Sequence, residues 1–349
     1  MAKKSGGKAE KTDYGALSRA LRENGPERLY LLWGEEDYLR ESFFAQVKEA
    51  CLSGGADDFN YHRLSGEDFD VRAFSQAVDA MPFLGGHTLV EVRGFDPNSV
   101  KEEAAERLAA VLSDIPDYCT VCLLLPIGAS PDGRLSFVKT LKKLGNAIEF
   151  TPQSQSLLAS WIRRHFEALG KSISQQNCEK LIFTAGELMT RLVPEIEKLA
   201  AGAPGDEITS ADIDRLVQRI PEASVFEMTD RLAERNYDAA AALLAELLQS
   251  GEHPIMLLAL IGGQMRKLYV ARVALDEKKD RNFVMTACNL KMPFMAEKLL
   301  RSAPGFSAAQ LAYAVALCAE CDYRMKSSSE DDEELLKELL LRIAVGETK

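Results

Sequence analysis

A chain of 349 residues is long enough for two or three domains with a large buried core. Apolar residues make up 46% of it and charged residues 27%, which is ordinary for a soluble globular protein. The formal net charge of −11 argues against tight DNA binding by the chain on its own, although a local basic patch is still allowed.

The cysteines and the N-terminal segment indicate the compartment. The seven cysteines are odd in number and most lie in apolar segments, which predicts reduced, buried thiols in a cytoplasmic protein. No apolar stretch reaches the length that spans a membrane. Residues 1–13 are polar and rich in lysine with no apolar core after them, so we expect a disordered tail and not a secretory signal.

Residues 14–150 alternate short apolar runs with amphipathic stretches of helical length. This pattern predicts an α/β module in which crossover helices join parallel strands. The runs "LVEV" and "VCLLL" are typical of central strands that are covered on both faces. The predicted strands lie in "RLYLLWG", "FNYHRLS", "HTLVEVRGF", "CTVCLLLP" and "NAIEFT".

Two all-α regions are predicted after this module. In residues 151–220 the strand pattern disappears, "SLLASWIRRHFEALG" has helical spacing, and Ser210 is expected to cap a further helix. Residues 221–349 are helical again, and the last helix, "EDDEELLKELLLRIAV", begins with acids that favour a helix start. The stretch "PIMLLALIGG" carries more apolar surface than a small bundle needs, which indicates assembly with partner subunits.

The first predicted strand ends at Gly34, where a nucleotide-binding protein would place its phosphate loop. Such a loop needs glycines whose amides converge on the anion, a lysine for the terminal phosphates and a hydroxyl for magnesium. Here Gly34 is followed by Glu35, Glu36 and Asp37, and no lysine follows in the turn. Carboxylates in a partly desolvated site repel a triphosphate. We therefore expect a degenerate phosphate loop that binds no nucleotide.

A structural role fits these acids better. The dipole of a helix favours negative charge at its first turn, so the acids are expected to cap a helix that begins here. Leu39 and Phe43 of that helix would then face the core. The strand "CTVCLLLP" ends in Pro126 where a nucleotidase would keep paired acids for magnesium. The frame of a nucleotide site is predicted without its chemistry.

Six segments in order resemble the delta subunit of the bacterial DNA polymerase III clamp loader, and the resemblance covers nearly the whole chain. It implies an AAA+-like module at 14–150 without activity, a helical lid at 151–220, and a helical collar at 221–349 that joins partner subunits. The segments are "LYLLWGEEDYLRE", "AVDAMPFLGGHTLVEVRG", "DGRLSFVKTLKKLGNAIEF", "LASWIRRHFEALGKSIS", "LVPEIEKLAA" and "SVFEMTDRLAERNYDAAAALLAELLQSGEHPIMLLALIGGQMRKLY".

The resemblance also implies a function. A delta subunit binds the ring-shaped sliding clamp (beta) and holds one ring interface open. Partner ATPase subunits (gamma/tau), together with delta prime, then load the clamp on primed DNA. The chain would belong to a DNA-directed DNA polymerase holoenzyme, a nucleotidyltransferase. We expect no catalytic residue, cofactor or metal of its own.

The segment "DAMPFLGGHT" contains the candidate binding residues. Phe83 and Leu84 are adjacent, so they cannot both point into one core position, and glycines follow them. An adjacent aromatic and aliphatic pair at a loop tip is typical of an anchor that enters a partner's apolar pocket. The alternative is that Phe83 fills the core beneath the sheet. The resemblance assigns clamp binding to Phe83 and Leu84, with Met81 as a support.

Other chemistry receives less support from the sequence. Two CxxC pairs could form a zinc site, but the first lies in a strand-like run and the second on an apolar helix, so buried thiols are favoured. None of the four histidines lies in a recognised nucleophile motif. Several basic clusters could contact DNA, and the sequence does not distinguish among them. The alternatives in function are an active AAA+ ATPase and a helical scaffold protein unrelated to DNA.

Overall fold

The computed structural model describes residues 13–52, 57–84 and 86–346. A disordered tail was predicted at residues 1–13, and residues 1–12 of it lie outside the described residues. Asp13 is described and caps the first helix. The chain forms two compact units. The first comprises residues up to Pro152 together with Leu188–Thr190, and the second comprises Gln153–Glu187 and the chain from Arg191 onward.

The first unit contains a parallel sheet, which has five strands in the described part of the chain. Its order is β2-β3-β4-β1-β5, and each pair of neighbours is parallel. The predicted central strands β3 and β4 are indeed inside the sheet, and both are almost wholly buried. The strands are β1 Leu29–Gly34, β2 Tyr61–Ser65, β3 Thr88–Arg93, β4 Cys119–Leu124 and β5 Asn146–Phe150.

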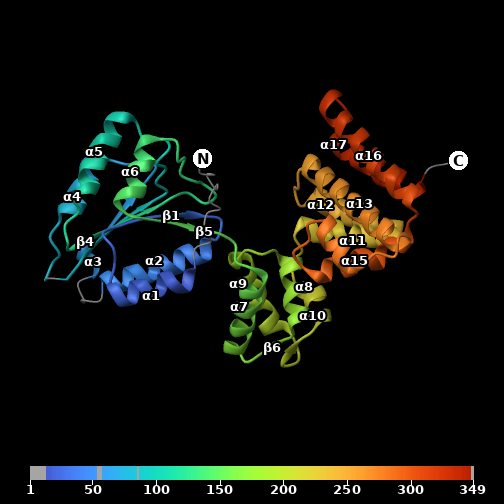
Figure 1. The fold of residues 1–349 in the computed structure, drawn as a ribbon, viewed down its shortest axis with the longest axis horizontal. Helices are drawn as coiled ribbons and strands as arrows, with labels where there is room; N and C mark the ends of the chain where they lie inside the picture. Colours follow the sequence, from blue (N-terminus) through green and yellow to red (C-terminus); the bar gives the residue numbers. More distant parts are fainter. Residues whose placement is uncertain (1–12, 53–56, 85, 347–349) are drawn as a thin grey trace, which may run out of the picture. The chain divides into compact units, whose positions relative to one another are not determined.

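Helices cover both faces of this sheet (Figure 1). The alternation of β1 side chains explains why two layers are needed. Leu31 and Trp33 join the apolar core beneath α4, α5 and α6, whereas the Tyr30 ring lies 5.7 Å from that of Phe43 on α2. The helices are α1 Tyr14–Asn24, α2 Asp37–Cys51, α3 Asp57–Asn60, α4 Val71–Asp79, α5 Glu102–Ser113 and α6 Ser136–Leu144. The α/β fold with crossover helices is therefore confirmed.

The predicted strand "FNYHRLS" begins too early. Phe59 and Asn60 end the short helix α3, and β2 starts only at Tyr61. The pairing of β2 with β3 starts at Tyr61, opposite Leu89, and the Asn60 side chain bonds to the backbone of Phe83 just before this ladder. An apolar run alone gives no sign of such a contact.

The second unit is almost entirely helical. Its one addition to the predicted pattern, among the residues described, is a short parallel pair of strands, β6 Ser172–Ile173 and β7 Glu207–Ile208. Its helices are α7 Gln155–Ala168, α8 Gln175–Ala185, α9 Met189–Gly202 (whose first two residues belong to the first unit), α10 Ser210–Leu216, α11 Pro221–Ala233, α12 Tyr237–Gln249, α13 Pro254–Asp276, α14 Arg281–Ala287, α15 Pro293–Ser302, the 3₁₀ turn Ala303–Gly305, α16 Ala308–Ser327 and α17 Asp332–Val345.

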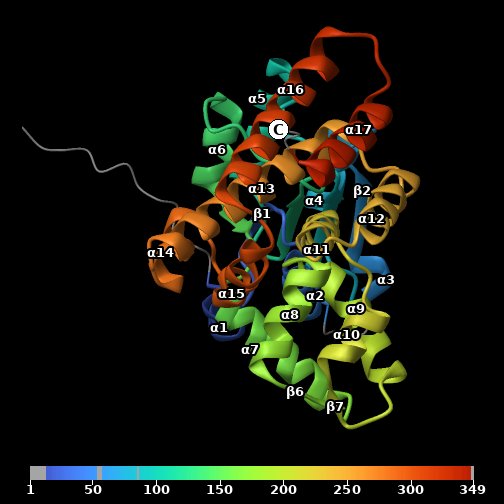
Figure 2. The ribbon, with the colours of Figure 1, turned by 90° about the vertical axis from the view of Figure 1, so that its right-hand side faces the viewer.

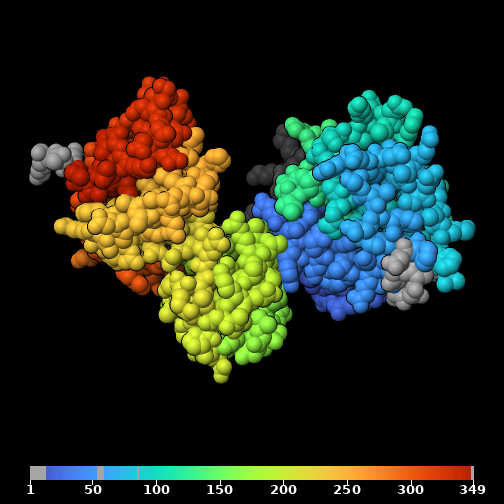
Figure 3. Space-filling model, turned by 180° about the vertical axis from the view of Figure 1, so that it is seen from behind, coloured from blue at the N-terminus to red at the C-terminus, as the bar shows by residue number. Residues whose placement is uncertain are grey.

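Helices α11 to α17 share one apolar core, and Phe183 of α8 is part of it. Phe183 of α8 packs edge to face on Phe226 of α11, with ring centroids 5.3 Å apart, and also lies 6.0 Å from Phe294 of α15. The views in Figures 1 and 2 both place α8 beside α11 and α15, and Figure 3 shows a continuous surface over this unit. The boundary between lid and collar at residue 220 therefore stays a prediction, since the two regions pack as one unit.

Two details of the helical region differ from the prediction. The cap of α10 is Thr209 and not Ser210, because the Thr209 hydroxyl accepts from the Asp212 amide while the Asp212 carboxylate accepts from the Thr209 amide. In "PIMLLALIGG", Leu257, Leu258 and Ile261 belong to the core, and Ile255 and Met256 are the exposed large apolar side chains. Within the described residues, no helix is long and apolar enough to cross a membrane.

The prediction of buried thiols is confirmed for most cysteines. All seven are free, and only Cys288 is more than marginally accessible. Burial raises the pKa of Cys119 to about 12 and that of Cys178 to about 11, so both stay protonated at neutral pH. The described chain brings together no group of His, Cys, Asp or Glu side chains that could hold a metal ion.

The end of β1 depends on a glycine. Gly34 has φ of +131°, and a Cβ built there would lie 2.1 Å from the carbonyl oxygen of Phe150. This close approach lets the Glu36 amide donate to the same carbonyl at 3.0 Å, which ties the turn after β1 to the end of β5. Only a residue without a side chain fits there.

We therefore predict that Gly34→Ala destabilises the protein strongly. Gly128 is the matched control, because it also has positive φ, +77°, but a Cβ there would meet open space. Left-handed backbone alone costs about 1–2 kcal/mol in Gly128→Ala. The clash at Gly34 should add about 1–3 kcal/mol more. Urea unfolding of both variants measures the difference, and equal stabilities would contradict a packing role for Gly34.

Candidate functional site

The loop between α4 and β3 exposes the three apolar side chains that the sequence singled out. Met81 is 82% exposed, Phe83 53% and Leu84 85%. Leu84 also has a left-handed backbone, with φ of +58°, which a residue with a side chain adopts only when its surroundings impose it. Phe83 is thus not a core residue beneath the sheet, and the alternative of a buried plug is wrong.

A fourth apolar side chain extends this surface. Phe59 is 69% exposed, and its ring centroid lies 5.1 Å from that of Phe83. The sequence did not indicate this neighbour, because Phe59 lies in a run with the pattern of a strand. We call Phe59, Met81, Phe83 and Leu84 the apolar patch. Exposed apolar side chains that cluster on one surface are typical of protein-interaction sites.

The turn after β1 is filled by side chains of the chain itself. The guanidinium of Arg40 on α2 is buried, donates to the carbonyl oxygen of Leu125 at 2.9 Å and pairs with Asp37. Leu125 directly follows β4, so this interaction closes the carboxyl edge of the sheet between β1 and β4. In open α/β sheets, ligands bind in the crevice outside the carboxyl ends of the strands. That crevice is occupied here by an ion pair.

The acids of this turn do not act as simple helix caps. Glu35 is exposed, and Glu36 is fully buried and makes no side-chain cap to α2. One Glu36 carboxylate oxygen instead accepts from the amide of Met189, the first residue of α9, at 3.2 Å. Met189 belongs to the same compact unit as the sheet. The expectation that the acids cap α2 is therefore wrong for Glu36, while Asp37 does lie in the first turn.

A second buried carboxylate lies within the sheet. Glu91 on β3 accepts from Tyr61 and pairs with Arg93 at 2.7 Å, and Arg93 in turn pairs with Glu41 of α2 at 2.7 Å. Burial and the nearby Glu91 carboxylate raise the pKa of Tyr61. Burial also raises the pKa of Glu41, but the bonds and charge of Arg93 outweigh it and leave that pKa lowered. The single acid inside "LVEV" was the available sequence signal for this network.

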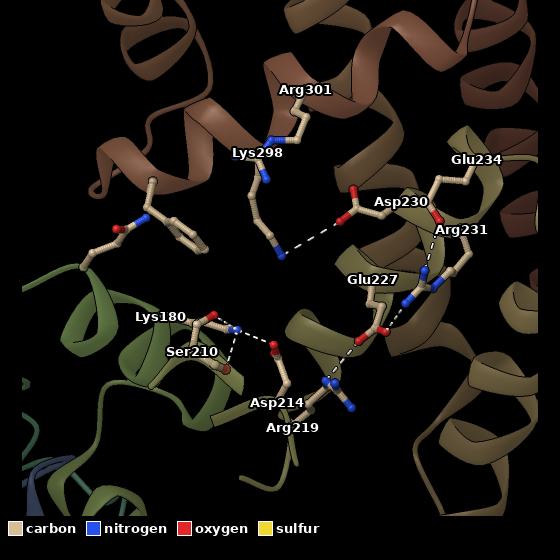
Figure 4. Close-up of a pocket in the computed structure, with 12 residues that line it drawn as sticks. Lys180, Ser210, Asp214, Arg219, Glu227, Asp230, Arg231, Glu234, Lys298 and Arg301 are labelled. Carbon is tan, nitrogen blue, oxygen red and sulfur yellow. Dashed lines mark hydrogen bonds and ion pairs between the residues drawn. The ribbon is translucent and has the colours of Figure 1, made fainter. Parts of the chain in front are cut away.

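The second unit contains a polar cavity of about 470 Å³ between α8, α10, α11 and α15 (Figure 4). Its lining carries five cationic and four anionic side chains, and most of them form ion pairs. Lys298 points across the cavity toward Asp230, at 3.9 Å, and its ammonium lies 5.0 to 5.6 Å from three phenylalanine rings. Burial lowers the pKa of Lys298 and raises that of Asp230. The other ion pairs are Lys180–Asp214, Arg219–Glu227, Arg231–Glu227 and Arg231–Glu234. We interpret this cavity as a structural network that joins the helices.

Comparison with known proteins agrees with this architecture. The family model described as "DNA polymerase III, delta subunit" matches residues 30–151, and the model described as "DNA polymerase III delta subunit, C-terminal domain" matches residues 222–343. The chain belongs to the DNA polymerase III delta subunit family. The first matched range contains the apolar loop and the degenerate phosphate loop of this delta-family chain, and the second contains most of its helical core.

Two relatives match over nearly the full length and support the same assignment. The chain is 26% identical over 335 residues to the DNA polymerase III subunit delta of Bacillus subtilis, and the aligned region covers 93% of this chain and 95% of the relative. It is 23% identical over 322 residues to a probable DNA polymerase III subunit delta of Aquifex aeolicus, with 90% of each covered. A solved structure of the Bacillus subtilis DNA clamp loader delta protein has a TM-score of 0.49 and 22% identity, covering 95% of this chain and 100% of that one.

The filled turn after β1 predicts that this delta-family chain does not bind ATP. Arg40 and Asp37 occupy the crevice, and Glu35 adds a further negative charge. Equilibrium titration with a fluorescent ATP analogue and magnesium is therefore expected to show no saturable binding at micromolar concentrations. An AAA+ ATPase that has the phosphate-loop lysine is the positive control. Saturable micromolar binding to this chain would contradict the prediction.

Proposed function

We propose that this chain is the subunit of a clamp loader that binds the ring-shaped sliding clamp and helps to open it. The observation that carries the proposal is the exposed loop with Met81, Phe83 and Leu84, a cluster of large apolar side chains on a constrained backbone. Anchors of this kind concentrate binding energy in a few side chains that enter a pocket. Membership of the delta family supports the clamp as the partner.

Ring opening follows from binding thermodynamics. A ligand shifts a conformational equilibrium by the difference between its affinities for the two states. If the loop binds the clamp more tightly when one ring interface is open, then the difference in binding free energy between the open and the closed ring shifts the equilibrium toward the open ring. This chain would therefore need no ATP hydrolysis of its own for this step. In the proposal, the neighbouring ATPase subunits (gamma/tau) and delta prime use ATP to control when the clamp is engaged and released on primed DNA.

The absence of catalysis belongs to the same proposal. The turn after β1 holds an ion pair where an ATPase would hold phosphate, so the active AAA+ ATPase alternative has little structural support. The module would serve as a rigid carrier of the loop in a cytoplasmic replication assembly. A scaffold protein unrelated to DNA is disfavoured by the family membership of the chain.

The helical second unit is the proposed assembly region. Its apolar core is buried within the unit. At the start of α13, however, Ile255 is 51% and Met256 39% exposed. Because the N-terminal turn of α13 presents both side chains to solvent, we propose that this end of the helix contacts a neighbouring loader subunit. The phenylalanine contacts between α8 and α11 mean that a cut near Arg219 would open a shared core. Point substitutions therefore test the assembly region better than truncation.

The double variant Phe83→Ala with Leu84→Ala is predicted to lose clamp binding and to stay folded. Truncated anchors typically cost about 2 kcal/mol or more each, or at least about thirtyfold in affinity. Both side chains are largely exposed, so the melting temperature should fall by only a few degrees. Calorimetry with a bacterial sliding clamp and thermal unfolding measure the two effects.

Ile127→Ala is the matched control for this experiment. Ile127 is 73% exposed on another loop of the same unit, so its truncation tests whether the loss of an exposed apolar side chain elsewhere affects binding. The control should bind the clamp as the parent does. A double variant that binds the clamp with parental affinity, or that unfolds at the assay temperature, would show that the loop is not the anchor.

The assembly region gives a further prediction. Ile255→Lys with Met256→Lys should weaken association with the loader ATPases by about tenfold or more, since two unpaired charges would be buried at the contact. Clamp binding should not change. Leu157→Lys on α7 is the control, because Leu157 is 59% exposed in the same unit. Analytical size-exclusion chromatography of reconstituted loaders measures the outcome, and parental assembly by the Ile255 and Met256 variant would refute this surface.

A further inference from the structure

The backbone of the apolar loop is held by a side chain from a distant part of the sequence. The Phe83 amide donates to Oδ1 of Asn60 at 2.6 Å, and Nδ2 of Asn60 donates to the Phe83 carbonyl oxygen at 3.3 Å. Asn60 is itself buried. One amide side chain thus satisfies both backbone groups of Phe83, as a neighbouring strand would do. The Phe83 ring is left free to face outward.

The topology of the sheet explains why these residues meet. β2 and β3 are parallel neighbours, and Tyr61 is paired with Leu89. Asn60 directly precedes β2, and Phe83 lies in the loop that leads into β3. Because the amino ends of parallel strands lie at one edge of a sheet, the segments that precede β2 and β3 are brought side by side. The contact is a consequence of the fold and not a chance approach of two loops.

The far end of the same loop is also fixed. The hydroxyl of Thr88, the first residue of β3, donates to the carbonyl oxygen of Ala80 at 3.0 Å. Leu84 keeps its left-handed backbone between these two attachments. A strained backbone of this kind costs about 1–3 kcal/mol and persists only where neighbouring contacts impose it. The backbone of Phe83 is therefore preorganised, which lowers the conformational entropy that binding must offset.

Phe59 presents its ring beside that of Phe83. The two rings are tilted by 43°, and both remain more than half exposed. An aromatic pair that buries so little of its area contributes little to folding. The same pair offers an apolar face to a partner, and the loop that carries Phe83 also exposes Met81 and Leu84.

We propose that Phe59 is a fourth contact side chain for the apolar pocket of the sliding clamp, and that Asn60 is a positioning residue that fixes Phe83 for insertion into that pocket. This inference rests on the proposed function of the loop. The proposed clamp-binding surface therefore includes the segment before β2 as well as the loop at residues 81–84.

The two roles separate in a double-mutant cycle. Asn60→Ala and Phe59→Ala are each expected to weaken clamp binding by about tenfold in the parent. In a Phe83→Ala background, Asn60→Ala should have no further effect, because Asn60 acts through Phe83. Phe59→Ala should still weaken binding in that background, because its ring touches the clamp itself. Biolayer interferometry on immobilised clamp measures all the affinities.

Amide hydrogen exchange measures the hydrogen bond between Asn60 and the Phe83 amide directly, which clamp affinity does not. Exchange of the Phe83 amide should be slow in the parent and fast in Asn60→Ala. Asn60→Asp keeps the acceptor oxygen, so it should restore much of the protection and part of the affinity. Phe283→Ala, which removes an exposed aromatic ring from the second unit, is the control and should bind as the parent does.

The outcomes distinguish this inference from the function on which it rests. Parental affinity in both Phe59→Ala and Asn60→Ala, with binding lost in Phe83→Ala with Leu84→Ala, overturns the inference and leaves the function intact. A Phe59→Ala effect that vanishes in the Phe83→Ala background overturns the contact role of Phe59. Unchanged exchange of the Phe83 amide in Asn60→Ala overturns the positioning role of Asn60. Full binding by the Phe83 and Leu84 double variant overturns the proposed function itself.

Discussion

The buried guanidinium of Arg40 is the interaction on which the N-terminal module depends. A buried charge is tolerated only when it is paired and hydrogen-bonded, and Arg40 has Asp37 and the Leu125 carbonyl for this purpose. These contacts tie the first turn of α2 to the end of β4, across the crevice where a nucleotide would otherwise link the same elements. Glu36 adds a link from the same turn to the start of α9. The turn after β1 is thus held by contacts within the chain itself.

This arrangement keeps the closed crevice away from the candidate binding surface. The crevice lies at the carboxyl edge of the parallel sheet, and the apolar loop lies at the amino edge, before β3. A strand of six residues separates the two edges by about 20 Å. Side chains can therefore fill the carboxyl edge without disturbing the loop. The sheet contributes to the proposed function by holding the amino ends of β2 and β3 in fixed register.

The sequence predicted the parts of this fold that follow from local pattern. The apolar runs located the strands of the sheet, and the acidic turn after Gly34 predicted a phosphate loop without its chemistry. The pair Phe83 and Leu84 was singled out because adjacent bulky residues cannot both point into one core position, and the resemblance to the delta family assigned clamp binding to it. In each case the signal lies within about ten residues.

The features that escaped prediction depend on contacts between distant segments. The role of Asn60 requires knowing that β2 and β3 are neighbours, which periodicity does not reveal. Glu36 was expected to cap its own helix, but its partner, Met189, is 153 residues away. The packing of Phe183 on Phe226 joins regions that composition separates at residue 220. A hydroxyl at either Thr209 or Ser210 could cap α10, and only the geometry of the Asp212 bonds decides between them.

The apolar patch also has a consequence for the chain before it meets a partner. Exposed large apolar side chains can pair with those of a second copy, which favours self-association. A net charge of −11 opposes this, because like-charged molecules repel at the distances where patches meet. That repulsion is screened within about 10 Å at 0.1 M salt. Colloidal stability of the unassembled subunit is therefore a balance between an apolar loop and an acidic surface, and added salt shifts the balance toward association.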